Sequence, residues 1–365
     1  MKKKKILVFN LTPRGWMLHY SSQFCNELNK WNNLKLKVAI ASYHDSILYD
    51  SNIGFIKIRT NPNLYSFLLD SLNIFYHIYF LYKVFKYSPD IVHFLDNHPW
   101  YSFYIKIFKL LWYKVYVTQH DPTLHSWESS SLLWKIAAYT NRVLRSASDK
   151  LFVHWDVLRE EVIKQHKISE KKVFSIKHGA YTFFNRWAKW LAVQRNTFLF
   201  FGRILDYKWL DTLLSALKQV KNSFPDFQLI IAWPWDMSSY KKDLDAFKDN
   251  IKIYNYNIEP EEAYKYFEIC EFVVLPYKDA TGSWVIPVSY SFSKAVLATK
   301  VWELISVVEE WKTWYLVEAN NSQILWQKII EMLQEKDRIR SMWKEWKIFS
   351  DMELSWGSII SNVYR

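Results

Sequence analysis

The sequence predicts an α/β protein made of two doubly wound domains in tandem. Strand-like runs alternate with helical patterns through both halves of the chain, which is the order of parallel sheets covered by helices. A polar stretch over residues 184–196 separates the two sets and predicts a linker. With 365 residues, half of them apolar, the chain can bury two cores, which excludes disordered, collagen-like and small disulfide-stapled proteins.

The expected strands follow one another in a regular order. In the first half they are 6–9, 36–41, 91–95, 113–118, 150–154 and 173–176, and in the second half 197–202, 228–232, 251–254, 271–276, 295–299 and 315–317. Helical spacing is clearest over 209–221, 261–268 and 322–335. Ligands of such sheets bind beyond the carboxyl ends of the strands, so we expect the function in the loops that follow them.

The longest apolar stretch, residues 65–85, sets a limit on membrane insertion. It is interrupted by Asp70, Asn73 and His77, so it falls short of the roughly 18 uninterrupted residues that a transmembrane helix requires. We expect a buried helix, and an interfacial membrane helix is the alternative.

Charge is unevenly distributed along the chain. Residues 1–190 carry 27 Lys and Arg against 13 Asp and Glu, whereas residues 191–365 carry 21 against 23. This predicts that the first half meets an anionic surface, a membrane leaflet or nucleic acid, unless the charge serves only solubility. The usual nucleic-acid reader motifs are absent from the sequence, so no nucleic-acid partner is expected.

Two features favour a cytoplasmic location. Cys25 and Cys270 lie far apart and outside any metal-binding spacing, which indicates neither a disulfide framework nor a zinc site. The chain opens MKKKKILVFN, and its apolar run is too short for a signal peptide, so it reads as a first strand.

Glycine and tryptophan are present in unusual numbers. The chain has 6 Gly and 20 Trp, together about 7% of its residues, which is the ordinary share of glycine alone. Many tryptophans stand in turns after strands, where a close backbone approach or a positive φ favours glycine and resists an indole. The positions concerned are Trp16, Trp209, Trp233, Trp235, Trp284, Trp302, Trp311 and Trp314.

If glycine is placed at these positions, several segments match the motifs of a known protein family. The second half contains FFGRILDYKWLDTLLSAL, LIIAWPWD and GSWVIPVSYSFSKAVLATKVWELISVVEEWKTWYLV. The first half contains PRGWMLHYSSQFCNEL, PDIVHFLDNH, VYVTQHD, FVHWDVLRE and IKHGAY. In this order they resemble retaining glycosyltransferases of family 4. The resemblance implies the GT-B fold, two Rossmann-like domains facing a central cleft.

The tryptophans have a simple explanation at the level of translation. Some bacterial lineages read the codon UGA as glycine, and other translation tables read it as tryptophan. We therefore hypothesise that UGA-encoded glycines are written as tryptophan in this sequence. The alternative is a protein that uses real indoles to stack on sugars.

The resemblance implies that Arg203 and Lys208 hold the donor diphosphate, whose negative charge grows as the glycosidic bond breaks. Backbone N–H groups at loops and helix starts would add to this without a metal. The remaining donor-binding candidates are Gly15, Trp16, Gly202, Trp233, Trp235, Thr281, Gly282, Ser283, Trp284, Val285 and Ser289.

The sequence departs from the family at one place. Many members carry two glutamates seven residues apart that contact the donor sugar and the ribose, and Thr281 and Ser289 occupy those positions here. Hydroxyls can replace some of those hydrogen bonds. The departure leaves the donor sugar open, and slow or lost activity is the alternative to a normal enzyme.

The first half offers a third catalytic candidate. His120 follows the strand at 113–118 and matches a family histidine that faces the donor sugar, although it could also be structural. His98 and His178 are weaker candidates. Asp243 and Asp245 have the spacing of a metal-binding DxD but lie in a lysine-rich amphipathic helix expected over 240–249, so no metal and no cofactor are expected.

We therefore expect a hexosyl-type glycosyltransferase that moves a sugar from a nucleotide-diphosphate sugar to a glycan or lipid-linked acceptor with retention of configuration. Envelope polysaccharide or glycolipid synthesis at the inner face of the cell membrane is the expected setting. The expected domains are 1–190 on the acceptor side, 191–345 on the donor side, and a helical segment 346–365 that packs back on the first. The alternatives are a binding protein without turnover and a nucleotide-sugar epimerase.

Overall fold

The chain forms two compact units. The computed structural model describes residues 3–12, 16–44, 46–60, 63–120, 132–202, 210–234, 236–278, 283–301, 304 and 315–364. Unit 1 comprises Met1–Gly179 together with Trp356–Arg365, and unit 2 comprises Ala180–Ser355. The predicted boundary at residue 190 and the predicted start of the returning segment at residue 346 each lie about ten residues from the divisions seen in the structure.

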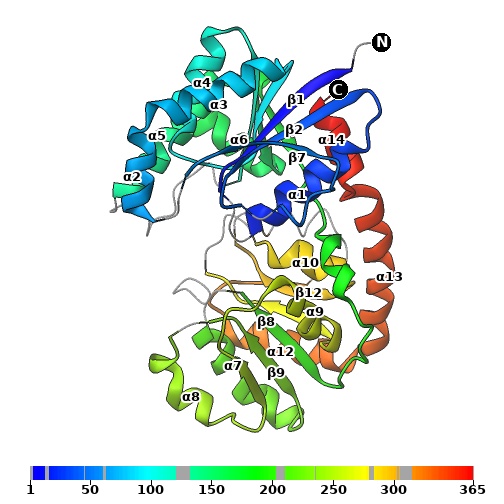
Figure 1. Ribbon diagram of the computed structural model, residues 1–365. Helices are drawn as coiled ribbons and strands as arrows, with labels where there is room; N and C mark the ends of the chain where they lie inside the picture. Colours follow the sequence, from blue (N-terminus) through cyan, green and yellow to red (C-terminus); the bar gives the residue numbers. More distant parts are fainter. Residues whose placement is uncertain are drawn as a thin grey trace. The chain divides into compact units, whose positions relative to one another are not determined.

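Unit 1 is built on a seven-stranded sheet of order β3-β2-β1-β4-β5-β6-β7, in which every pair is parallel (Figure 1). Its strands are β1 Lys4–Asn10, β2 Leu34–Ala41, β3 Gly54–Ile58, β4 Ile91–Phe94, β5 Lys114–Gln119, β6 Lys150–His154 and β7 Val173–Ile176. Its helices are α1 Trp16–Asn29, α2 Leu64–Leu72, α3 Ile74–Tyr87, α4 Tyr101–Leu110, α5 Leu132–Ala147, α6 Asp156–His166, η1 Glu170–Lys172 and α14 Trp356–Tyr364.

Unit 2 contains a six-stranded sheet of order β10-β9-β8-β11-β12-β13, again with parallel pairs. Its strands are β8 Thr197–Phe201, β9 Gln228–Ala232, β10 Ile251–Tyr254, β11 Phe272–Leu275, β12 Ala295–Thr299 and β13 Tyr315–Val317. The helices are η2 Thr182–Trp187, α7 Leu210–Ser223, η4 Ser238–Tyr240, α8 Lys241–Asp245, α9 Pro260–Ile269, α10 Val285–Ser291, α12 Ser322–Gln334 and α13 Lys336–Glu353.

The central strands explain why the fold can be predicted from the sequence. Helices cover both faces of a parallel sheet, so its inner strands are continuous apolar runs. In β1 and β8, residues 6–9 and 198–200 are fully buried. All twelve predicted strands are present, and six of them have the predicted bounds. The edge strand β3 was missed because it is short, begins with a glycine and alternates between buried and exposed residues.

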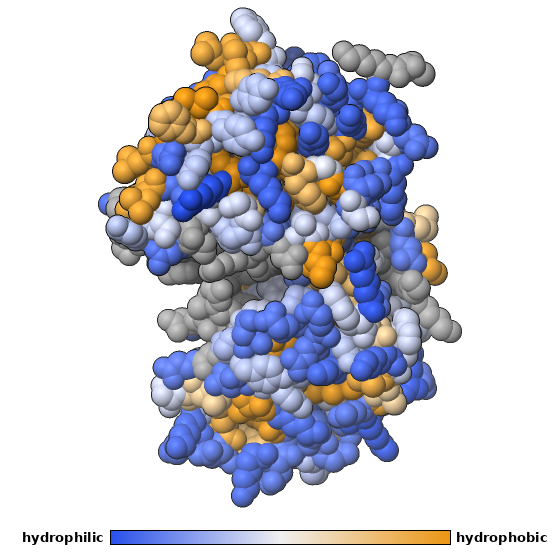
Figure 2. Space-filling model, viewed as in Figure 1, coloured by the Kyte–Doolittle hydropathy of each residue, from blue (hydrophilic) through white to orange (hydrophobic). Residues whose placement is uncertain are grey.

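The apolar stretch at 65–85 does not form the buried helix that we expected. It divides at Asn73 into α2 and α3, because the Asn73 side chain accepts the backbone N–H of Tyr76 and starts a new helix. One face of α3 packs on the core, and the other carries apolar side chains that are exposed. Figure 2 shows these apolar side chains gathered over α2, α3 and α4. Among the described residues, none of the helices combines the length and the apolar character needed to cross a bilayer.

The last helix of the chain belongs to unit 1. Helix α14 lies beside α1 (Figure 1), where the ring centroids of Tyr20 and Trp356 are 5.0 Å apart. The Tyr364 hydroxyl also lies 2.7 Å from Nδ1 of His93 in β4. A Cβ at Gly179 would overlap the Trp356 ring, so only glycine fits at this contact. Residues more than 170 positions apart therefore share one core.

Candidate functional site

Two of the donor-site candidates, Gly202 and Trp233, lie at the carboxyl ends of β8 and β9. Gly202 follows β8 with φ of 103° and donates its N–H to the Ala232 carbonyl at 3.2 Å. Trp233 follows β9 with φ of 155° and donates its N–H to the Tyr254 carbonyl at 3.1 Å. Both positions use backbone conformations that favour glycine, and only one of them has it.

Three aromatic rings cluster at this edge of the sheet. The ring centroids of Phe201, Trp233 and Trp284 are each 5.6 Å from the other two. The two indoles therefore pack together at the end of β8, where the sequence analysis expected backbone groups to approach a donor. With tryptophan at both positions, this space is occupied by the protein itself.

The segment that leads into α10 is partly directed toward the core. Val285 and Ser289 are fully buried, and the Ser289 hydroxyl donates to the Val285 carbonyl at 2.7 Å. The Ser283 hydroxyl lies 3.2 Å from that of Tyr277, and Trp284 is the residue before the helix. The structure thus brings Gly202, Trp233 and Trp284 to one edge of the unit 2 sheet. The Ser289 hydroxyl instead bonds to a backbone carbonyl of α10.

The other donor-site candidates lie outside the described residues. They are Gly15, Arg203, Lys208, Trp235, Thr281 and Gly282, together with Trp209, Trp302, Trp311 and Trp314 among the suspected glycines. Trp16 is described as the first residue of α1, and its side chain is not described.

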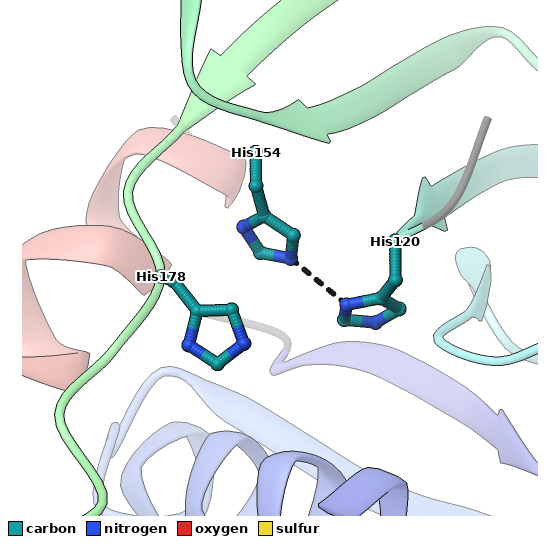
Figure 3. Close-up of side chains that lie close together, drawn as sticks. All are labelled: His120, His154 and His178. Atoms are coloured by element: carbon teal, nitrogen blue, oxygen red, sulfur yellow. Dashed lines mark hydrogen bonds between the residues drawn. The ribbon is translucent and has the colours of Figure 1, made fainter. Parts of the chain in front are cut away.

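Three histidines meet at the carboxyl edge of the unit 1 sheet (Figure 3). His120 directly follows β5, His154 ends β6, and His178 comes two residues after β7. Nε2 of His154 lies 3.0 Å from Nδ1 of His120. Nε2 of His120 lies 3.0 Å from the Leu95 carbonyl oxygen, and Nδ1 of His178 lies 3.2 Å from that of Gly179. Both nitrogens of His120 thus face groups of unit 1.

Burial keeps these rings neutral at pH 7. It lowers the pKa of His120 to about 3 and that of His178 to about 4, and it places the pKa of His154 well below its usual range. Sequence reasoning singled out His120 and, less strongly, His178. It missed His154, although the three histidines stand at or within two residues of the ends of three consecutive strands, and that shared position was the available signal.

Tryptophan is frequent among residues with unusual backbone angles. Nine non-glycine residues of the described chain have positive φ, and four of them are Trp112, Trp155, Trp190 and Trp233. Trp155 has φ of 69° and ψ of 154°, in a region that is essentially reserved for glycine. These angles agree with glycine at the four positions.

Trp112 follows α4 at the position where glycine usually ends a helix. Its N–H bonds to the Lys109 carbonyl and the next N–H, of Tyr113, bonds to the Phe108 carbonyl, which is the Schellman pattern. Its φ is 61° and its side chain is 93% exposed, so the indole has almost no packing to lose.

We expect Trp112→Gly to stabilise unit 1 by about 1 kcal/mol, because glycine adopts the left-handed conformation without the strain of a side chain. Trp112→Ala keeps the Cβ and should give little of this gain. Urea unfolding of the two variants beside the parent protein measures the difference, and equal stability of the glycine and alanine variants would contradict the prediction.

Comparison with known proteins locates the similarity. Residues 183–347 match the family model described as glycosyl transferases group 1. An uncharacterized glycosyltransferase from Methanocaldococcus jannaschii is 27% identical over 175 residues, which are 46% of this chain and 46% of the relative. The chain thus spans less than half the length of the curated relative that it matches.

The fold is shared along the whole chain. Sucrose-phosphate synthase from Thermosynechococcus elongatus superposes with a TM-score of 0.74 at 16% identity, covering 100% of this chain and 98% of that one. Anabaena HepE in complex with UDP and glucose has a TM-score of 0.70 at 13% identity, with 99% and 98% covered. A UDP-GlcNAc 2-epimerase from Neisseria meningitidis, bound to UDP-GlcNAc, gives 0.66 at 12% identity, with 99% and 98% covered. Residues 183–347 therefore match the glycosyl transferases group 1 family, within a chain whose two parallel-sheet units have the GT-B fold.

Proposed function

We propose that this protein is a glycosyltransferase that transfers a hexosyl group from a nucleotide-diphosphate sugar to a glycan or lipid-linked acceptor with retention of configuration. The observation that carries the proposal is the family match over 183–347, which includes Arg203, Lys208 and the segment 281–289. The similar fold of a protein solved with UDP and glucose supports a nucleotide-sugar donor.

The chemistry that we propose for the donor is electrostatic. Arg203 and Lys208 would hold the diphosphate and stabilise the charge that it gains as the glycosidic bond breaks. The family resemblance also gives His120 a contact with the donor sugar. Because its Nε2 faces the Leu95 carbonyl and its Nδ1 faces His154, the ring would have to turn to reach a sugar. We therefore propose that His120 contributes less than the two cations.

We also propose that the native protein has glycine at many of the tryptophan positions. The four tryptophans with positive φ support this, and so does the pair of indoles packed over the end of β8. Reading the codons at the twenty tryptophans in the source DNA tests the proposal. UGA at positions 112, 155, 190 and 233 would support it, whereas UGG at all four would overturn it.

The activity is tested on a version with glycine at those positions and at 16, 209, 235, 284, 302, 311 and 314. We expect release of nucleotide from a sugar donor, and a loss of at least tenfold in kcat/KM on Arg203→Ala, because the diphosphate charge would lose its fixed cation. Coupled detection of released UDP over a panel of UDP-sugars and acceptors measures this. His120→Gln should lose less activity than Arg203→Ala.

The two alternatives give different results in the same assay. Tight nucleotide binding without turnover over the panel would favour a binding protein. Conversion of the donor sugar into an epimer without any transfer would favour an epimerase, whose fold this chain also shares.

We further propose that unit 1 lies on an anionic membrane surface through helices α2 and α3. The outward faces of these helices carry the exposed apolar residues Tyr65, Leu68, Leu69, Leu72, Ile74, Phe75, Ile78, Tyr79 and Tyr82. Lys83 lies with its Nζ 4.3 Å from the Tyr79 ring centroid, a cation beside an aromatic ring at the border of the apolar face. An apolar face with a cation at its border, on the half that holds the excess positive charge, suits the interface of an acidic leaflet.

Co-sedimentation with liposomes tests the surface. We expect more protein to pellet with vesicles containing phosphatidylglycerol than with phosphatidylcholine alone, and Leu72→Glu with Phe75→Glu to reduce pelleting at least threefold. Ile348→Glu in α13 is the matched control, because Ile348 is also an exposed apolar side chain on a helix. Equal pelleting by the double variant and the control would refute the assignment to α2 and α3.

A further inference from the structure

The three histidines of unit 1 share a place in the fold that suits a ligand. Strands β5, β6 and β7 are neighbours in the sheet, and each brings one histidine to its carboxyl end. One ring nitrogen from each of the three lies within 4.8 Å of the others (Figure 3). The three imidazoles are thus held close together by the order of the strands in the sheet.

Hydrogen bonds fix the protons on two of these rings. A carbonyl oxygen can only accept, so Nε2 of His120, which faces the Leu95 carbonyl, carries the proton of that ring. Nδ1 of His178 carries the proton of its ring for the same reason, since it faces the Gly179 carbonyl. In both neutral rings the lone pair therefore lies on the other nitrogen, which is Nδ1 of His120 and Nε2 of His178.

The third ring, that of His154, cannot form hydrogen bonds with both of its nitrogens at once. Nε2 of His154 must carry a proton to donate to Nδ1 of His120 at 3.0 Å. Its Nδ1 then bears a lone pair, and this atom is buried without a hydrogen-bond partner. The carbonyls of Ile176 and Lys177 interact with the ring in the sense that favours a proton on it. A proton on Nδ1 would instead leave two lone pairs opposed at 3.0 Å.

A cation among the three nitrogens would remove this conflict. The His154 proton could move to Nδ1, beside the carbonyls, and all three lone pairs would then point at the cation. Metal-ligating histidines usually donate their other ring nitrogen to a carbonyl or carboxylate, as His120 and His178 already do. We propose that His120, His154 and His178 form a binding site for one zinc ion.

The donor set determines the class of metal. Three neutral imidazoles without a thiolate suit Zn²⁺ and its neighbours Co²⁺ and Ni²⁺, and disfavour Mg²⁺ and Ca²⁺, which prefer oxygen. Zn–N bonds of about 2.1 Å place tetrahedral ligand atoms about 3.4 Å apart. Because the three nitrogens lie within 4.8 Å of one another, no pair needs to close by more than about 1.4 Å. A water molecule would complete four-fold coordination. The proposal departs from the expectation of no metal, because the three residues are too far apart in sequence for any spacing motif.

The test uses the full chain, freed of metal with a chelator and titrated with ZnCl₂ by calorimetry. We expect a stoichiometry of one zinc ion per chain. With Co²⁺ in place of zinc, we expect the visible absorption bands of a four-coordinate site. His154→Gln and His178→Gln should each weaken zinc binding at least 100-fold. His166→Gln is the control, because His166 ends α6 and lies outside the cluster, and it should bind zinc like the parent protein.

Circular dichroism of the metal-free variants separates loss of a ligand from loss of the fold. If His154→Gln does not fold, His178→Gln and the Co²⁺ spectrum of the parent protein decide the question. Zinc binding of equal strength in His178→Gln, or no saturable binding to the parent protein, would overturn the proposal. The proposal does not rest on the glycosyltransferase function, and its readout needs no enzymatic activity.

Discussion

Lowering the pH from 7 to 5 is expected to destabilise unit 1 by at least about 3 kcal/mol, the net effect of His93, His98 and Asp96 alone, and to leave unit 2 almost unchanged. All ten histidines of the chain lie between His19 and His178, so unit 2 has none. Burial lowers the pKa of His93 and of His98 to about 3, whereas an unfolded histidine has a pKa near 6.5. His98 also accepts the N–H of Trp100 on Nδ1, a bond that protonation would break.

The sign follows from proton binding in the two states. Below pH 6.5 the unfolded chain binds protons at its histidines, whereas the folded chain does not. The contribution of each histidine to the free energy of unfolding is therefore lost as the pH falls from 6.5 toward 3. At pH 5 this amounts to about 2 kcal/mol for each of His93 and His98. Asp96 acts in the opposite direction, because burial raises its pKa to about 6 and its folded form gains a proton first. That gain is about 1 kcal/mol, so the histidines determine the outcome.

Hydrogen exchange at pH 7 and pH 5, corrected for the intrinsic rates, measures both units in one sample. Peptides from β1, β4 and β5 should lose protection, and peptides from β8, β9 and β11 serve as the internal control. His98→Gln should reduce the difference between the two pH values by about 2 kcal/mol, since it removes one titrating group. Equal loss of protection in both units would count against this account.

Glu268→Ala is expected to destabilise unit 2 by about 3 kcal/mol. The Glu268 carboxylate, only 6% exposed, accepts the backbone N–H groups of Lys189, Trp190 and Leu191 at 3.1 Å each. Hydrogen bonds to a charged group are stronger than neutral ones, and three of them hold this loop against α9. Alanine removes all three acceptor contacts at once.

A graded series of variants tests the role of the Glu268 charge. Glu268→Gln keeps one acceptor oxygen, so we expect about half of the loss seen with alanine. Glu262→Ala is the matched control on the same helix. Its half-buried carboxylate pairs with Lys265 at 3.0 Å and accepts the Tyr256 hydroxyl at 2.8 Å, and these solvent-accessible contacts should contribute less than about 1 kcal/mol. Urea unfolding followed by far-UV circular dichroism gives the three values, and an alanine loss no larger than that of Glu262→Ala would contradict the prediction.

Much of the fold could be predicted because buried parallel strands have a strong sequence signal. Strand β6 reads KLFVH and β12 reads AVLAT, and both have the predicted bounds. The same reasoning failed at α2 and α3, because it assumes that apolar helical residues face a core. Side chains such as Phe75 and Leu72 are apolar and exposed, and composition alone cannot distinguish that arrangement from burial. The helix expected over 240–249 likewise shortens to α8.

The candidate site was predictable only in part. Gly202 and Trp233 lie at strand ends, as their motifs indicate, because a turn after a parallel strand places the backbone at the sheet edge. The burial of Ser289 could not be predicted, since the helix phase that turns its hydroxyl toward Val285 depends on packing. His154 was missed because the cluster depends on the order of β5, β6 and β7 in the sheet, which no local spacing encodes.

The position of α14 also has a consequence for biosynthesis. Residues 356–364 leave the ribosome after all of unit 2, yet they supply Trp356, Ile360 and Tyr364 to the core of unit 1. During translation unit 2 can therefore complete its fold first. Until α14 is synthesised, Tyr20, Phe24 and His93 of unit 1 lack their contacts with Trp356 and Tyr364. A nascent chain stalled at residue 355 should thus expose an apolar surface that chaperones recognise, although it already contains every strand of both sheets.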